Sequence, residues 1–72
     1  MKVILFGAGE MTMEFLASED SLQYDIQAIA DNDKSKHGSV ICFGDRCIKV
    51  VSAKDVLLYD FNVVLITIYK FA

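Results

Sequence analysis

Two glycines near the start of the chain, Gly7 and Gly9, have the spacing of a turn that can hold a phosphate. They follow the apolar run Val3–Phe6 and precede a helical pattern over Glu10–Ser18. The first glycine permits a tight turn from strand to helix, and the second has no Cβ to block the backbone N–H groups. The positive end of the following helix then points at the phosphate. The pattern predicts a nucleotide-type ligand, with a purely structural turn as the alternative.

An acidic residue follows the second expected strand, Tyr24–Ala30, in which Tyr24, Ile26, Ala28 and Ala30 should share one face. This residue, Asp31, could accept hydrogen bonds from a ribose, or it could be an ordinary solvated acid. If the ligand is a dinucleotide, a carboxylate here repels a 2′-phosphate and predicts a preference for NAD over NADP.

The polar loop after Asp31 contains other groups with possible chemistry. Asp31 and Asp33 could hold a divalent ion on a diphosphate, although so short a motif recurs by chance. Lys34 and Lys36 could reach a phosphate or simply be hydrated, and His37 is expected to be exposed. No catalytic constellation is evident, and one histidine with two cysteines is too few ligands for a structural zinc site.

Two short β-type runs, Val40–Phe43 and Arg46–Val51, flank Gly44-Asp45 and predict a hairpin with positive φ at the glycine. This register pairs Cys42 with Cys47, with Cα atoms about 4.5 Å apart. An easily reduced disulfide is then geometrically possible, and in the cytosol we expect two thiols.

The last third of the chain predicts one more helix and one more strand. Ser52–Asp55 resembles a capping box that starts a brief helix through Leu58, and Asn62–Ile68 reads as a strand buried on both faces. The order β-α-β-hairpin-α-β predicts an α/β, open parallel sheet with the first strand central. A ligand should lie at the carboxyl ends of the strands. The residues expected to bind the cofactor there are Gly7, Gly9, Glu10, Met11, Asp31, Asn32 and Thr67.

Composition limits the class of protein. The chain has 72 residues, 54% of them hydrophobic, no proline and a net charge of −3. It has no apolar run of the roughly 18 residues of a transmembrane helix and no signal-peptide pattern, so a cytoplasmic protein is expected. Without a basic stripe, neither nucleic acid nor a membrane is an expected partner.

The whole chain, 1–72, resembles a known family through Val-Ile-Leu-Phe-Gly-Ala-Gly-Glu, Ile-Ala-Asp-Asn-Asp and Asn-Val-Val-Leu-Ile. It looks like the compact Rossmann-like domains of nucleoside-diphosphate-sugar dehydratases, epimerases and other polysaccharide-biosynthesis proteins, also found before methyltransferase or acetyltransferase domains. The resemblance implies a truncated Rossmann-like fold, the N-terminal part of a larger protein, and NAD(P) or a nucleotide sugar held by Gly7, Gly9 and Asp31. It implies no catalytic residue. Thr12 departs from it, because the fingerprint has a third glycine or alanine there, and this should push the helix outward.

The function expected from the sequence is therefore nucleotide-type ligand binding for a sugar- or polysaccharide-modifying protein. One alternative is an interaction or oligomerisation module that uses the open edge of the last strand, which would give a homo-oligomer or a contact with a further domain. Another is an accessory domain linked to S-adenosylmethionine, which the hairpin disfavours.

Overall fold

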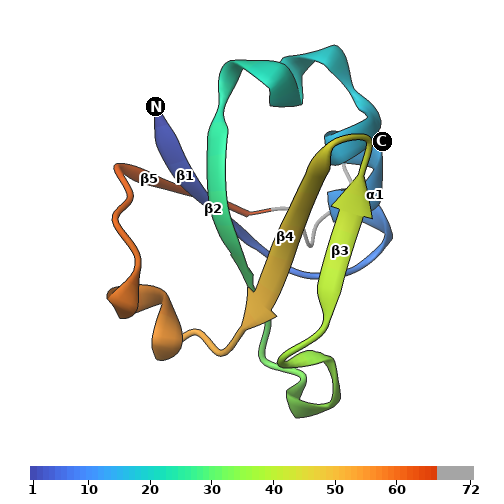
Figure 1. The fold of residues 1–72 in the computed structure, drawn as a ribbon. Coiled ribbons are helices and arrows are strands. Elements are labelled where there is room, and N and C mark those ends of the chain that lie inside the picture. Colours follow the sequence, from blue (N-terminus) through green and yellow to red (C-terminus); the bar gives the residue numbers. More distant parts are fainter. Residues whose placement is uncertain (67–72) are drawn as a thin grey trace.

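The structure, a computed structural model, describes residues 1–66 as one five-stranded sheet with helical segments around it (Figure 1). The strands follow the order β3-β4-β2-β1-β5, so β1 lies between β2 and β5 as expected. In chain order the elements are β1 (Lys2–Phe6), α1 (Glu10–Ala17), η1 (Glu19–Gln23), β2 (Asp25–Ala30), η2 (Lys34–Lys36), β3 (Val40–Phe43), β4 (Arg46–Val51), η3 (Asp55–Leu58) and β5 (Val63–Ile66), where η marks a 3₁₀-helix.

The expected open parallel, Rossmann-like sheet is wrong as a fold class. Strand β1 pairs in parallel with β2 and β5, and β2 with β4, but β3 pairs antiparallel with β4, so the sheet is mixed. Within residues 1–66 there is a single α-helix, on the first crossover. A doubly wound fold needs further crossover helices on the sheet, and this part of the chain does not supply them.

The second crossover forms a brief helix through Leu58 as expected, and it is the 3₁₀-helix η3. The Ser52 hydroxyl accepts a hydrogen bond from the Asp55 N–H at 3.1 Å, so the capping contact does form. Only Val56 of η3 is buried, whereas Leu57 and Leu58 are 79% and 83% exposed. One buried side chain is too little packing to sustain an α-helix of several turns, because short helices depend on tertiary contacts.

The core lies on both faces of the sheet. On one face Val3, Leu5 and Ile29 pack with Leu16 of α1, and on the other Ile4, Ala28 and Ala30 pack with Val56. The pairing of β1 with β2 shifts register after Val3, so Gln27 is skipped. Tyr24 and Ile26 therefore pack with the first cluster, while Ala28 and Ala30 pack with the second, and the expected single face is wrong.

Helix α1 is anchored by a threonine. Thr12 and Leu16 are its buried residues, and the Thr12 hydroxyl donates a hydrogen bond to the Gly7 carbonyl. Thr12 thus ties the helix to the turn, and the outward push expected from its side chain stays a prediction. No helix within residues 1–66 is long and apolar enough to cross a membrane.

Strand β5 borders the described sheet and is less buried than the sequence suggested. Val63 and Val64 are 37% and 43% exposed, although adjacent residues of a strand point to opposite faces. Both faces of β5 are therefore partly uncovered. Residues 67 and 68 of the expected strand lie outside the described residues.

The hairpin has the predicted register and turn. Gly44 has φ +60°, and Cys42 pairs with Cys47 with a Cα separation of 4.0 Å. The two sulfurs form a disulfide, and both cysteines are exposed. The disulfide thus joins β3 to β4 close to the hairpin tip, where Arg46 contacts Ser21 of η1.

We predict that the double variant Cys42→Ser/Cys47→Ser is less stable than the oxidised wild type by about 2 kcal/mol. The variant loses the constraint that the bridge places on the unfolded chain, and the loss is modest because the bridge closes only a short loop. Urea denaturation measures this difference. Wild type reduced with a dithiol serves as the control and should match the variant. Equal stability of the oxidised wild type and the variant would show that the bridge does not constrain the unfolded chain.

Candidate functional site

The glycine turn joins the end of β1 to the start of α1. Gly7 has φ +112°, a conformation that favours glycine, and its N–H donates to the Ala30 carbonyl at 2.7 Å. Gly9 has an ordinary φ of −107° and forms the N-cap of α1, with no side-chain cap. A Cβ built at Gly9 meets no atom within 4 Å. The start of the helix is thus open, and its first N–H groups have no capping side chain.

Asp31 closes the turn from the neighbouring strand. Its Oδ2 accepts a hydrogen bond from the Ala8 N–H at 2.6 Å, and its Oδ1 accepts one from the Asp33 N–H at 2.7 Å. The side chain is only 14% exposed. The structure therefore brings Gly7, Gly9 and Asp31 to one edge of the sheet, as the parallel pairing of β1 and β2 requires. The role of Asp31 at a ribose stays a prediction.

The surroundings of Asp31 favour its charged form. Burial raises the pKa of the carboxyl, but the N–H groups of Ala8 and Asp33 and the charge of Lys36 outweigh burial, so the pKa lies below its usual value. The pKa of Asp33 is also lowered, first by the Ser35 hydroxyl and then by the Ser35 N–H. Asp31 is therefore an anion at neutral pH.

Lys36 brings a cation to the same turn. Its Nζ lies 3.5 Å from the Ala8 carbonyl oxygen and 4.0 Å from Asp31 Oδ2, with the side chain 42% exposed. Lys34 lies on the same 3₁₀-turn and is exposed. Their sequence context does not separate the two lysines, and the 3₁₀-helix η2 brings Lys36 to the glycine turn.

His37 lies beside the loop and not in open solvent as expected. Its Nε2 is 2.6 Å from the Asp31 carbonyl oxygen, and the residue is half-buried. The imidazole of His37 thus anchors the backbone of the loop at Asp31.

The remaining predicted residues surround the turn to different degrees. Glu10 begins α1 and is exposed, Met11 is half-buried, and Asn32 is exposed after Asp31. Thr67 lies outside the described residues. The site seen in the structure is therefore the turn 7–11 with Asp31 and Lys36.

The described fold and site define a small mixed-sheet domain with a glycine turn closed by an acid. A family model described as C2185-like, N-terminal, matches residues 1–72, and the chain belongs to this family. No curated protein and no solved structure matches the chain. The resemblance to Rossmann-like domains of nucleotide-sugar enzymes is therefore wrong, and the description of the family gives no indication of nucleotide binding. A glycine turn followed by an acid is too short a pattern to separate such families.

We predict that Asp31→Asn lowers the free energy of unfolding by about 2 kcal/mol at neutral pH, through weaker hydrogen bonds to Ala8 and Asp33. Because the folded-state pKa is depressed, this stabilisation is complete above the unfolded pKa of about 3.9 and is lost as the pH falls through the lower folded pKa. Denaturation of wild type and variant from roughly pH 2 to pH 7 should show the difference closing in acid. Asp45→Asn, at the exposed hairpin tip, is the control. If the difference in free energy of unfolding between wild type and Asp31→Asn did not change with pH, the stabilisation could not come from the ionised Asp31 carboxylate.

Proposed function

We propose that the chain is a binding domain whose glycine turn takes the phosphate of a small nucleotide-type ligand, with NAD(P) and a nucleotide sugar as the candidates. The observation that carries this proposal is the uncapped start of α1 at Gly9 with the Lys36 ammonium beside the same turn. The proposal rests on this geometry and takes no support from the family.

The turn offers the phosphate both donors and space. The backbone N–H groups at the start of a helix, together with the helix dipole, favour an anion. The open position above Gly9 lets an oxygen approach these groups without meeting a side chain. Lys36, which is 42% exposed, adds a positive charge that can turn toward the ligand.

The negative charge of Asp31 limits where the phosphate can lie. Its carboxylate already engages the Ala8 N–H, so the donors left for a ligand begin at Gly9. Two hydrogen bonds and the nearby ammonium compensate much of this charge. The phosphate is therefore expected over Gly9, Glu10 and Met11, with Lys36 between it and Asp31.

We predict that Gly9→Val weakens nucleotide binding at least tenfold, about 1.4 kcal/mol, while the fold persists. The branched side chain fills the approach to the N–H groups, yet it has room and an ordinary φ. Calorimetric titrations with NAD, NADP, a uridine-diphosphate sugar and S-adenosylmethionine measure the affinity.

Two lysines supply a matched control for the same titrations. Lys36→Ala should lower the affinity for whichever of these compounds binds. Lys34→Ala removes an equal charge from the same 3₁₀-helix and should leave that affinity unchanged. Absence of saturable binding to all four compounds overturns the proposal. Equal losses in the two lysine variants would contradict the assigned phosphate position.

A second candidate function, an interaction module, is favoured by exposed apolar side chains around η3 and β5. Leu57 and Leu58 are 79% and 83% exposed, and Val63 and Val64 of the bordering strand are 37% and 43% exposed. Uncovered strands and apolar patches of this kind recruit other chains.

We predict that the chain self-associates with rising concentration, as measured by light scattering. Val64→Lys should reduce this association, because a charge on a bordering strand opposes pairing with another chain. Lys49→Glu, an exposed change on β4 with β2 and β1 between it and β5, is the control. A monomer at all concentrations would remove this second function.

A further inference from the structure

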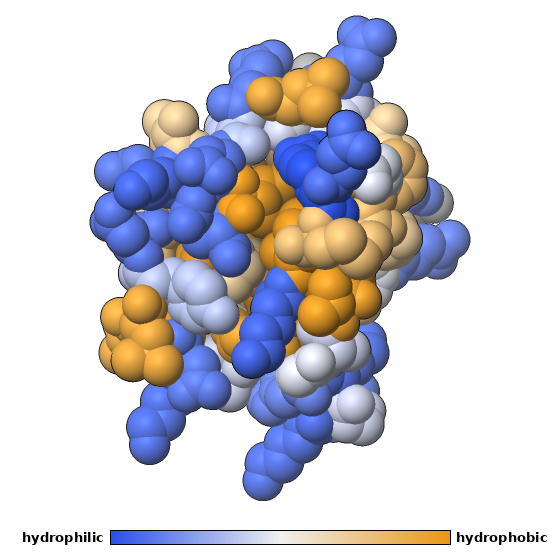
Figure 2. Space-filling view, viewed as in Figure 1, coloured by the Kyte–Doolittle hydropathy of each residue, from blue (hydrophilic) through white to orange (hydrophobic). Residues whose placement is uncertain are grey.

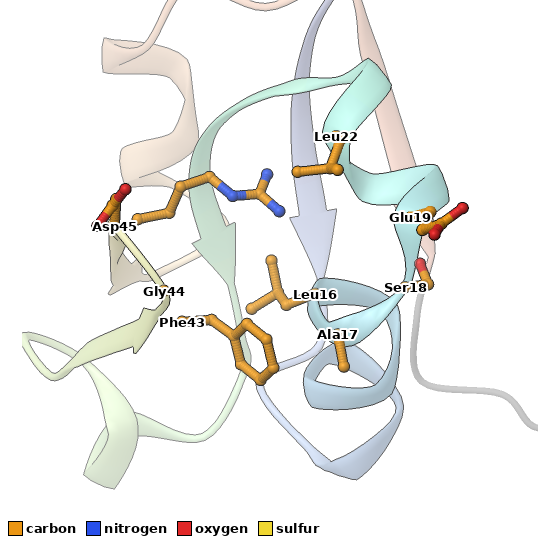
Figure 3. Close-up of a pocket in the computed structure, with 9 residues that line it drawn as sticks. Leu16, Ala17, Ser18, Glu19, Leu22, Phe43, Gly44 and Asp45 are labelled. Atoms are coloured by element: carbon orange, nitrogen blue, oxygen red, sulfur yellow. The ribbon is translucent and has the colours of Figure 1, made fainter.

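A cavity of about 410 Å³ lies at the end of the sheet opposite the glycine turn (Figure 3). It is bounded by the end of α1, by η1 and by the tip of the hairpin. Strand β4 runs parallel to β2 and β2 to β1, so Arg46 at the start of β4 and Gly7 after β1 lie at opposite edges. The cavity is therefore a separate site.

The lining of the cavity is largely apolar. Ala17, Leu22 and Phe43 are exposed, the last two at 74% and 39%, whereas Leu16 is 3% exposed and belongs to the core beneath them. Figure 3 shows the Phe43 ring turned toward Leu16, with Leu22 across the opening. Hydrophobic side chains also gather in the middle of the face that bears β3 and β4, with hydrophilic ones around them (Figure 2). A ligand here needs an apolar body.

Arg46 gives the cavity a fixed positive charge. One guanidinium nitrogen, Nη2, donates to the Ser21 hydroxyl at 2.6 Å, and Nη1 donates to the Ser21 carbonyl at 3.2 Å. Ser21 is fully buried, and its hydroxyl also lies 3.2 Å from the Leu16 carbonyl oxygen. These contacts use two of the five N–H donors of the guanidinium. Among the side chains that the structure describes, no carboxylate forms an ion pair with Arg46.

The acids that line the cavity leave the approach to Arg46 open. Glu19 and Asp45 are exposed, and Figure 3 shows both carboxylates turned away from the opening. A second negative charge on the ligand would double its attraction to Arg46 and its repulsion from these acids alike, so the shape of the charged group decides which ligand fits. The planar guanidinium also matches the two oxygens of a carboxylate.

We propose that this cavity binds a small amphipathic carboxylate, with its apolar chain or ring against Leu22 and Phe43 and its carboxylate on Arg46. The volume is at the lower end of the range for small-molecule sites, about 300 to 1,000 Å³. A compact ligand such as a medium-chain alkyl carboxylate or an aryl-alkyl carboxylate has suitable chemistry. This site is independent of the glycine turn.

The test is a titration of the ¹⁵N-labelled full chain, followed by amide chemical shifts, with octanoate and with 3-phenylpropanoate. These two probes distinguish an alkyl from an aryl ligand, and the matching alcohols, octan-1-ol and 3-phenylpropan-1-ol, lack only the charge. We expect saturable shifts over residues 16–22 and 43–46 with at least one carboxylate. The matching alcohol should bind at least tenfold more weakly.

Three variants locate the charge. Arg46→Gln should lower the affinity for the carboxylate at least tenfold and leave the affinity for the alcohol unchanged. Lys49→Gln removes an equal charge from an exposed position on the same strand and should change neither affinity. If Arg46→Gln does not fold, Leu22→Glu replaces it, because Leu22 is 74% exposed and a carboxylate there should repel the ligand.

Other outcomes overturn the proposal. These are equal binding of carboxylate and alcohol, absence of saturable shifts, or shifts confined to residues 7–11. Shifts at the cavity that depend on protein concentration without ligand would show that a second copy of the chain occupies it, and this result also overturns the proposal.

Discussion

The hydrogen bond from the Ala8 N–H to the Asp31 carboxylate joins the two central parallel strands at the edge where both end. It fixes the glycine turn and so the start of α1, while the second oxygen of Asp31 fixes the loop that follows. The loop then returns to β4, with the Gly38 N–H on the Val50 carbonyl and the Asp31 N–H on the Val51 carbonyl. A carboxylate of low exposure is stable here because N–H groups and Lys36 replace the water that it gave up.

Local chemistry made some of the fold predictable. Gly44-Asp45 between two β-type runs is sufficient to define the hairpin, its register and the facing cysteines, because a two-residue turn fixes the pairing of both strands. The bulge at Gln27 is different, since it exists only where β2 meets β1, and nothing in β2 alone marks the shift. The 3₁₀ type of η3 was not predictable either, because the Ser52 contact that starts it would also start an α-helix.

The candidate site was predictable in part for the same reason. Gly7, Gly9 and Asp31 meet because residues that follow adjacent parallel strands share an edge, and this follows from the strand order alone. Lys36 and His37 reach the site through the fold of the loop, where the Asp33 carboxylate accepts hydrogen bonds from Ser35 and η2 begins. Their spacing in the sequence has no period that reveals this approach. The error about the family has the same origin, because the turn and the acid report a local geometry that many folds share.

The two proposed sites depend on opposite physical effects and are held apart by α1. The glycine turn offers backbone dipoles and an ammonium to a phosphate, whereas the cavity offers apolar area and a single guanidinium. A helix of eight residues spans about 12 Å, with Thr12 bonded to the turn near its start and Leu16 bonded to Ser21 near its end. Strand β4 extends further, because the residues from Arg46 to Val51, whose carbonyl accepts the Asp31 N–H, span about 16 Å. This separation exceeds the screening length of about 8 Å at physiological ionic strength. The charges of Lys36 and Arg46 therefore influence each other weakly, and a ligand at one edge should leave the affinity at the other nearly unchanged.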